Sequence, residues 1–120
     1  MSVFDSALEQ VVTRVPEIRF VTLTDTEGIE VARKSVRSDE AAQSLASEYT
    51  TVLRTVVGMA KEHSLGALRE LQIGTEKTTA LLVAITAEYY LVALLDPDSI
   101  TGRARFHLRM AGLELEREFA

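Results

Sequence analysis

Three carboxylates lie close together around one glycine in the segment LTDTEGIEVARK, residues 23–34. Asp25 and Glu27 are two residues apart, Gly28 follows, and Glu30 lies just beyond. Such a cluster could hold a metal ion or supply an acid and a base. A calcium loop of the EF-hand type needs more oxygen ligands at regular spacing, and the segment lacks them. We therefore interpret it as a hairpin turn in which Gly28 supplies the required backbone conformation, with Glu30 pointing into solvent.

Other residues with catalytic potential are too few or too scattered to form a known motif. The two histidines, His63 and His107, fall in different predicted helices, and no H-E-x-x-H, P-loop or G-x-G-x-x-G sequence occurs. The sequence contains no cysteine, which excludes disulfides and thiolate metal sites. Tyr89 and Tyr90 open a buried strand, where one should pack in the core and the other point outward. We therefore predict no catalytic residue, no cofactor and no metal site.

The composition is typical of a water-soluble protein with one domain spanning residues 1–120. Hydrophobic residues make up 47% and charged residues 26% of the chain. A net charge of −5 argues against binding to duplex nucleic acid, which normally requires a basic surface. No apolar run approaches the ~18 residues of a membrane span. The N-terminus lacks the pattern of a signal peptide, so we expect a cytoplasmic protein.

Hydrophobic spacing predicts three helices and five strands in the order α-β-β-α-β-β-β-α. The predicted helices span residues 2–15, about 38–63 and about 101–119, and the predicted strands span residues 17–25, 29–35, 67–74, 78–86 and 89–96. The first, fourth and fifth strands are apolar on both faces, whereas the second and third resemble edge strands. The simplest arrangement is a five-stranded antiparallel sheet of order 2-1-5-4-3. The long middle helix should cover one face and the two terminal helices the other.

Several local features follow from the same patterns. Ser2 is a predicted N-cap of the first helix, Ser38 caps the middle helix, and Gly66 is its predicted C′ residue. In the first strand, Ile18 and Phe20 should share a face. In the second strand, one face should carry Glu30, Ala32 and Lys34. The buried stripe of the middle helix should contain Ala42, Leu45, Ala46, Tyr49, Val52, Leu53, Val56 and Ala60.

The last helix carries its charges against the preference of the helix dipole. Arginines lie in its first turns and glutamates near its end: Arg103, Arg105, Glu114, Glu116 and Glu118. We expect Asp96 and Asp98 to neutralise these arginines. The alternative is that the arginines, with Arg109, face an acidic partner. The buried seam of this helix should consist of Ala104, Leu108, Ala111 and Leu115.

Three segments and the order of elements resemble the Roadblock/dynein light chain family, and in particular its bacterial and archaeal MglB-like branch. The segments are VTLTDTEGIEVAR (residues 21–33), SDEAAQSLASEY (38–49) and EYYLVALLDPDSITGRARFHLRMA (88–111). The resemblance covers nearly the whole chain and implies a profilin-like/Roadblock α/β (α+β) fold. It also implies a non-enzymatic dimer, of this chain with itself or with a Roadblock paralogue. In such dimers the third strands pair edge to edge, and the two long helices form a platform for a small Ras-like GTPase.

The resemblance assigns two surfaces to residues of this chain. The dimer interface would contain small residues of the long helix, namely Ser44, Thr51, Thr55 and Gly58. It would also contain three residues of the third strand: Leu68, Glu70 and Gln72. Gly58 is central, because a glycine in mid-helix costs about 1 kcal/mol relative to alanine and invites a packing explanation. A solvated helix face with a tolerated glycine is the alternative. Candidates for contacting the partner are Glu48, Thr51, Arg54 and Thr55.

The resemblance implies a dimeric scaffold or regulator that binds a small GTPase and modulates its nucleotide cycle or localisation, for example as a GTPase-activating protein. Because the chain lacks a phosphate-binding loop, it is not itself the GTPase. An arginine finger is conceivable, but no arginine stands out as one. The alternative function is a structural adaptor subunit of a larger complex, without effect on GTP turnover. A ligand sensor would need an apolar pocket between the sheet and a helix.

Overall fold

The computed structural model describes residues 2–37 and 40–119. Its elements confirm the predicted order. They are α1 (Val3–Arg14), β1 (Ile18–Asp25), β2 (Glu30–Ser35), α2 (Glu40–Glu62), β3 (Glu70–Gly74), β4 (Thr79–Ala84), β5 (Tyr89–Leu95) and α3 (Gly102–Glu116), followed by a 3₁₀ turn at Arg117–Phe119. The predicted Ser2 cap is confirmed, because the Ser2 Oγ accepts a hydrogen bond from the Asp5 backbone N–H at 3.1 Å. The predicted Ser38 cap lies outside the described residues.

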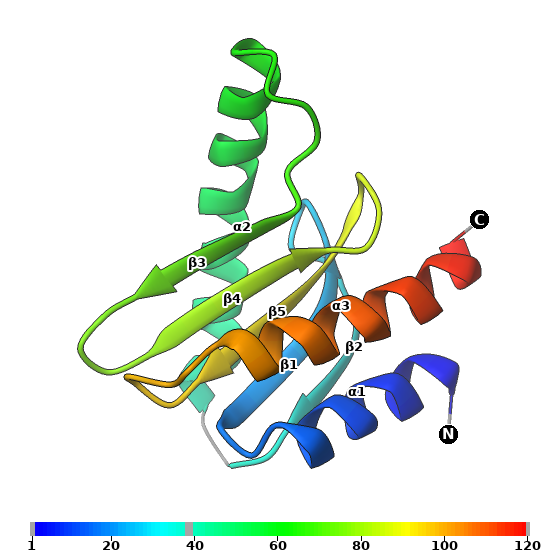
Figure 1. The fold of residues 1–120 in the computed structure, drawn as a ribbon, viewed down its shortest axis with the longest axis vertical. Helices are drawn as coiled ribbons and strands as arrows, with labels where there is room; N and C mark the ends of the chain where they lie inside the picture. The colour runs from blue at the N-terminus through cyan, green and yellow to red at the C-terminus, as the bar shows by residue number, and fades with distance from the viewer. Residues whose placement is uncertain (1, 38–39, 120) are drawn as a thin grey trace.

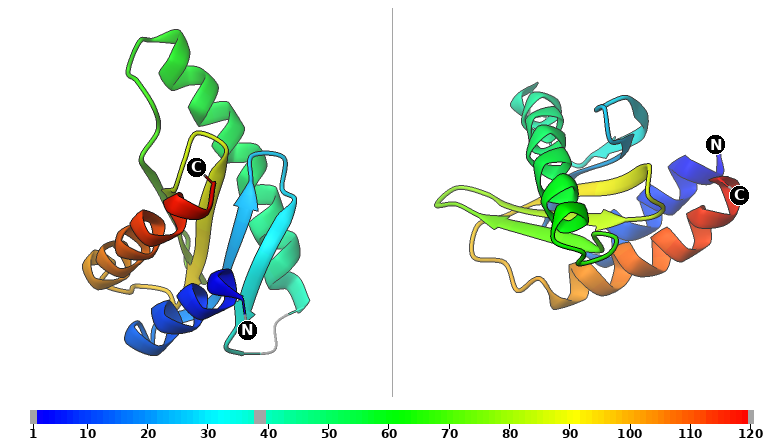
Figure 2. Two further views of the ribbon diagram at one scale, coloured as in Figure 1. Left: turned by 90° about the vertical axis from the view of Figure 1, so that its right-hand side faces the viewer. Right: turned by 90° about the horizontal axis from the view of Figure 1, so that it is seen from above.

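The five strands form one antiparallel sheet of order β2-β1-β5-β4-β3, as predicted. β2 and β3 are its two edges. Helix α2 crosses one face of the sheet, and α1 and α3 lie side by side on the other (Figures 1 and 2). The predicted assignment of helices to the two faces is therefore confirmed.

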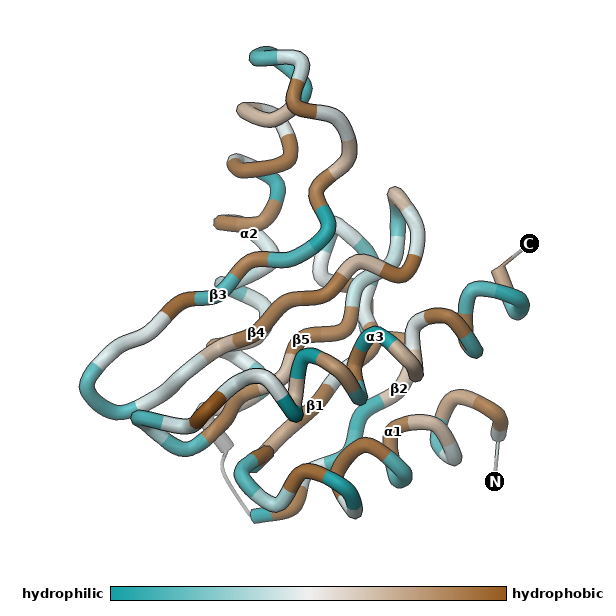
Figure 3. The backbone as a smooth tube through the Cα atoms, in the orientation of Figure 1, coloured by the Kyte–Doolittle hydropathy of each residue, from teal (hydrophilic) through white to brown (hydrophobic). Residues whose placement is uncertain are grey.

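The sheet separates two hydrophobic cores. The core under α1 and α3 includes Leu8, Val11, Leu23, Leu91, Leu108 and Leu115. The core under α2 includes Phe20, Ala46, Leu53, Leu82, Tyr90 and Val92. Strands β4 and β5 are hydrophobic along most of their length (Figure 3) because alternate residues enter opposite cores. The predicted seam of α3 is buried at all four positions.

A β-bulge at the start of β1 reverses one predicted side-chain direction. Ile18 pairs with Leu95 and Phe20 pairs with Leu94, so two steps along β1 oppose one step along β5. Ile18 consequently enters the α1/α3 core, whereas Phe20 enters the α2 core. The prediction that both share a face was wrong, because strict alternation holds only in a regular ladder.

A second irregularity places Glu30 under α2. Leu23 pairs with Ala32 and Thr24 pairs with Glu30, which shifts the register between β1 and β2. Ala32 therefore packs against the α1/α3 core. The Glu30 carboxylate lies on the opposite face, where the Thr22 Oγ donates a hydrogen bond to it at 2.8 Å. The predictions that Glu30 shares a face with Ala32 and points into solvent were both wrong.

Helix α2 ends in a Schellman motif centred on Ser64. Ser64 has a φ of +56°, its N–H donates to the Lys61 carbonyl at 3.2 Å, and the Leu65 N–H donates to the Ala60 carbonyl at 2.8 Å. Gly66 also has a positive φ of +86°, but it lies two residues further along the connection. The prediction of Gly66 as the C′ residue was wrong, because the two hydrogen bonds hold a serine in a conformation that usually favours glycine.

Candidate functional site

The acidic segment around Gly28, considered above as a possible metal site, is a turn that hydrogen bonds to the Asp25 carboxylate stabilise. The Asp25 Oδ1 accepts hydrogen bonds from the backbone N–H groups of Glu27 and Ile29, both at 2.9 Å. Gly28 has a φ of +85°, and a Cβ at this position would lie 3.2 Å from the Thr50 Oγ of α2. The interpretation of this segment as a hairpin turn is therefore confirmed, with Gly28 required both by backbone conformation and by the approach of α2.

Side chains with acid–base chemistry do not converge on one point. Within residues 2–37 and 40–119, no group of three histidine, aspartate or glutamate side chains could hold a metal ion. His63 is exposed in the α2–β3 connection, and His107 lies in α3 on the other side of the sheet. Burial raises the pKa of the Tyr90 phenol, which packs in the α2 core. Tyr89 is half-buried and stacks on Phe119, with ring centroids 3.9 Å apart.

The outstanding surface feature is the last part of α2, which projects past the end of the sheet (Figure 1). Between Thr55 and Ala67 only Ala60 is buried. Large apolar side chains are exposed in this region, Met59 by 47% and Leu65 by 68%, and so is Val52, by 43%, just before it. An isolated chain thus leaves an apolar helix surface in water without a covering element.

A groove of about 560 Å³ runs between the last turns of α2 and the chain that returns to β3. Its walls include Val56, Met59, Leu65, Leu68 and Glu70. The groove therefore joins the exposed apolar end of α2 to the free edge of the sheet at β3.

Sequence reasoning misjudged part of this region. Val52 was predicted in the buried stripe, but it lies beside the stripe while its neighbour Leu53 is fully buried. Met59 and Leu65 were not singled out. The signal that could have found Leu65 is a large aliphatic residue in a connection, immediately before an edge strand. Among the other stripe residues, Ala42, Ala46 and Ala60 are buried as predicted.

The predicted interface residues of α2 are all exposed: Ser44, Thr51, Thr55 and Gly58. A Cβ at Gly58 would meet no atom within 4 Å, so no contact of the isolated chain requires glycine there. Glu48 and Arg54 are exposed on the same helix. Arg54 is partly engaged, since its Nη1 donates to the Thr26 carbonyl of the β1–β2 turn at 2.8 Å.

The predicted interface residues of β3 face in two directions. Leu68, just before the strand, packs against the α2 core. Glu70 and Gln72 instead face α3. Arg105 and Arg109 approach the Glu70 carboxylate at 3.0 and 2.8 Å, and the Gln72 Oε1 accepts hydrogen bonds from Arg105 at 3.0 Å and from Thr101 at 3.2 Å. These contacts hold β3 against α3 and leave the outer backbone edge of β3 open.

The arginines of α3 are not neutralised as predicted. Arg105 and Arg109 pair with Glu70, and Arg103 lies 4.0 Å from Glu17. Asp96 instead pairs with Arg37 at 2.8 Å and with Arg19 at 3.6 Å, which ties the end of β5 to β1 and to the chain after β2. The prediction failed because sequence proximity to Asp96 does not bring the arginine side chains to it across the turn.

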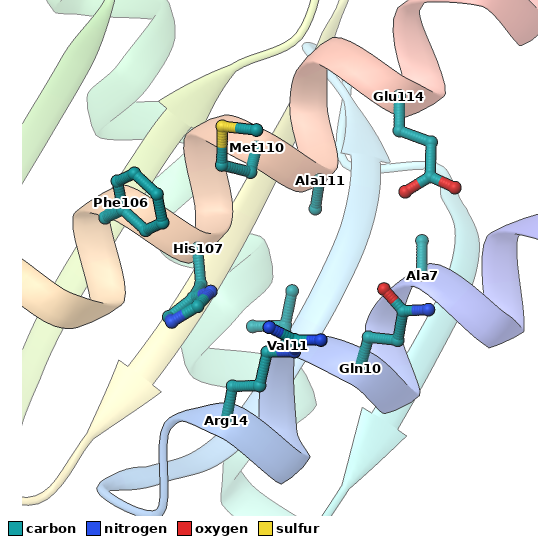
Figure 4. A pocket seen from close by; sticks show the side chains of 9 residues that line it. All are labelled: Ala7, Gln10, Val11, Arg14, Phe106, His107, Met110, Ala111 and Glu114. Carbon is teal, nitrogen blue, oxygen red and sulfur yellow. The ribbon is translucent and has the colours of Figure 1, made fainter.

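A second groove, of about 370 Å³, lies between α1 and α3. Figure 4 shows Gln10 and Arg14 on the α1 side and Phe106, His107 and Met110 on the α3 side. This groove lies between two helices. A hollow of about 430 Å³ lies between the sheet and a helix, where a ligand sensor would need its pocket, with Val83 and Ala84 on the β4 side and Gly112 and Leu113 on the α3 side.

Comparison with known proteins supports the fold strongly and the sequence relationship weakly. No protein-family model matches the chain, and no curated protein matches its sequence. Among solved structures, MglB of Myxococcus xanthus superposes with a TM-score of 0.87 at 18% identity, covering 99% of this chain and 96% of that one. The Roadblock/LC7 domain from Streptomyces avermitilis gives a TM-score of 0.84 at 13% identity, covering 96% of both chains.

The chain has the Roadblock/LC7 fold. MglC of Myxococcus xanthus, at 25% identity, shares this fold with a TM-score of 0.69 and covers 98% of this chain and 99% of its own. The resemblance to Roadblock and MglB-like proteins that the sequence indicated is thus confirmed at the level of the fold. In the described part of the chain, no helix is both long enough and apolar enough to cross a membrane.

Proposed function

We propose that this chain is a non-enzymatic, dimeric, cytoplasmic regulator that binds a small Ras-like GTPase and modulates its nucleotide cycle or location. The observation that carries the proposal is the exposed apolar surface at the end of α2, which no other element of the chain covers and which lies beside the free edge of β3. The structural likeness to MglB and MglC supports the choice of a regulator over other roles for this fold.

The dimer would form by pairing the β3 edges of two copies, or of one copy and a Roadblock paralogue. An open strand edge pairs readily because its backbone groups lack partners. The contacts of Glu70 and Gln72 with α3 hold β3 in place for such pairing. The same arrangement would bring two α2 helices together, burying Met59 and Leu65, and the small residue Gly58 would permit a close approach.

The GTPase would bind the part of the α2 pair that remains exposed. Glu48 and Arg54 offer charges of both signs there, and Thr51 and Thr55 lie at the boundary with the dimer seam. The hydrogen bond from Arg54 to Thr26 links this helix face to the β1–β2 turn. A partner that contacts Arg54 could therefore also contact the turn. The expected chemistry is recognition by polar and charged side chains, without a catalytic group from this chain.

Two measurements test the proposal. Met59→Glu should break the α2/β3 contact and lower the mass measured by light scattering, because it places a charge in the apolar contact, whereas Ile29→Glu at the opposite edge should not. Ile29 is a suitable control because its side chain is 63% exposed. A Met59→Glu protein with the native mass would contradict the dimer.

The GTPase is tested by co-purification of small GTPases from the source cell, followed by a nucleotide-turnover assay. The proposal predicts recovery of a Ras-like GTPase and a change in its turnover or location that Arg54→Glu weakens. If no GTPase is recovered and turnover is unchanged while the dimer persists, the chain is instead a structural adaptor.

A further inference from the structure

The outer face of α3 carries a row of exposed apolar side chains that the proposed dimer does not use. Phe106, Met110 and Leu113 are exposed by 58%, 50% and 61%. Their spacing of four and three residues places them on one side of the helix. This row, called here the α3 stripe, lies on the opposite side of the sheet from α2 (Figure 2).

The charges along α3 are divided between its two ends. Arg103, Arg105 and Arg109 occupy its first half, whereas Glu114, Glu116 and Glu118 follow, with Arg117 as the one base among them. Within the described chain, no ion pair involves these three glutamates. Both ends oppose the helix dipole. Arg105 and Arg109 pair with Glu70 of the same chain, and Arg103 lies 4.0 Å from Glu17, so Arg103 is the least engaged of the three arginines.

We propose that α3 packs antiparallel against α3 of a second copy of this chain, about a two-fold axis near Met110. An antiparallel arrangement sets the basic half of each helix against the acidic half of the other, and the two-fold axis repeats this contact on both sides. It also opposes the two helix dipoles. Phe106 of one copy then faces Leu113 of the other, and the two Met110 side chains meet at the centre.

The surface beside the α3 stripe has room for the side chains of a second helix. Leu113 lies at a hollow of about 430 Å³ that also includes Ile85 and Gly112. Phe106 and Met110 lie at the groove between α1 and α3 (Figure 4). Ridges of one helix can thus enter hollows beside the other, as packed helices require.

A second copy fits this surface better than an unrelated protein does. An unrelated partner would have to carry an acidic patch opposite the arginines and a basic patch opposite the glutamates. The α3 helix instead contains both halves of the complement, in the reversed order that self-association about a two-fold axis demands. The inference does not depend on the α2/β3 dimer. If both contacts exist, each copy has two separate interfaces and assembles beyond a dimer.

The first test uses two variants with opposite changes of charge. Arg103→Glu puts an acidic side chain at the basic end of α3, and the double variant Glu114→Arg/Glu118→Arg makes both ends basic. Each alone should weaken the α3 contact about tenfold or more, because like charges then face each other twice. Sedimentation should show each variant at a mass below the native one, namely the mass that remains without the α3 contact. An equimolar mixture of the two should recover the native mass, because each variant complements the other.

Stability provides an independent measurement on the same proteins. The double variant places positive charges at the C-terminal end of the helix, so its Tm at high dilution, where both proteins are dissociated, should exceed that of the native chain, while its self-association at higher concentration falls. A merely damaged fold would lower both. Glu88→Arg, at an exposed position in the β4–β5 turn, is the matched control and should keep the native mass.

The second test uses the absence of native cysteine. In Met110→Cys, two copies of the same residue meet at the axis and should form a disulfide-linked dimer within minutes under mild oxidation. Ile29→Cys, which is also exposed, should cross-link far more slowly. Adding Arg103→Glu should slow the Met110→Cys cross-link, in proportion to the weaker α3 contact. The proposal is overturned if the charge variants keep the native mass, if the mixture fails to reassemble, or if both cysteine variants cross-link equally.

Discussion

Replacing Gly58 with leucine should change the stability of the single chain and the stability of the dimer in opposite directions. Gly58 lies within α2, four residues before the last helical residue Glu62, is exposed, and has nothing within 4 Å of where a Cβ would be. In the isolated chain, leucine should therefore gain the full difference in helix propensity, about 0.8–1 kcal/mol. For a chain of this size we expect a rise in Tm of roughly 4 °C.

The dimer should respond oppositely if Thr51, Thr55 and Gly58 let the two α2 helices approach closely. A leucine inserted at such a contact costs about 1–3 kcal/mol per copy through overpacking, which raises the Kd by a factor of about ten or more. Light scattering over a dilution series measures this Kd, and thermal unfolding at high dilution measures the single chain. Gly58→Ala is the control, with a similar gain in the chain and a smaller intrusion. An unchanged Kd for Gly58→Leu would refute close approach at Gly58.

Three further outcomes follow from contacts within the chain. Gly28→Ala should lower the free energy of unfolding by about 1–3 kcal/mol in urea denaturation, because of its positive φ and the approach of the Thr50 Oγ. Glu70→Gln should cost about 0.5–1 kcal/mol at low salt and less at high salt, since it weakens two ion pairs with α3. The buried Tyr90 phenol has a pKa above the ordinary 10.0, so its folded state favours the neutral form. The contribution of the neutral Tyr90 phenol to the free energy of unfolding is complete below pH 10 and is lost as the pH rises through the folded pKa. Unfolding of Tyr90→Phe, measured against pH, should lack this loss.

The order of strands could be predicted because a strand that is buried on both faces has apolar residues at nearly every position, whereas an edge strand alternates. β4 and β5 are apolar at nearly every position, which requires a helix layer on both sides. β2 alternates between half-buried and exposed residues, which is typical of an edge. Once the two edges and the short hairpins were assigned, few arrangements of the sheet remained.

The irregular positions could not be predicted from alternation. A bulge depends on the fit between two strands and on the layers above them, and neither is written in the local pattern around Ile18 or Glu30. The ion pairs of α3 failed for a related reason. Glu70 lies 35 residues before Arg105 in the chain, and only the completed sheet brings them together.

The candidate surface on α2 and β3 stays a prediction, and the structure changes which side chains it would contain. Sequence analysis selected α2 and β3, and small polar residues were its main candidates. The structure adds Met59 and Leu65, whose exposure depends on where the sheet ends beneath α2. The length of a helix can be read from sequence, but the point at which its support ends follows from the strand lengths and the register together.

The projecting end of α2 has a consequence for the lifetime of the chain in a cell. Helical turns that pack against no other element unfold locally at a low cost in free energy, and short isolated helices have little stability in water. We expect Lys61, exposed in the last turn, to be cut by trypsin first in a copy that has no partner. Assembly would cover this site. Surplus copies would then be degraded before assembled ones, so that the abundance of the chain follows that of its partners without any transcriptional control.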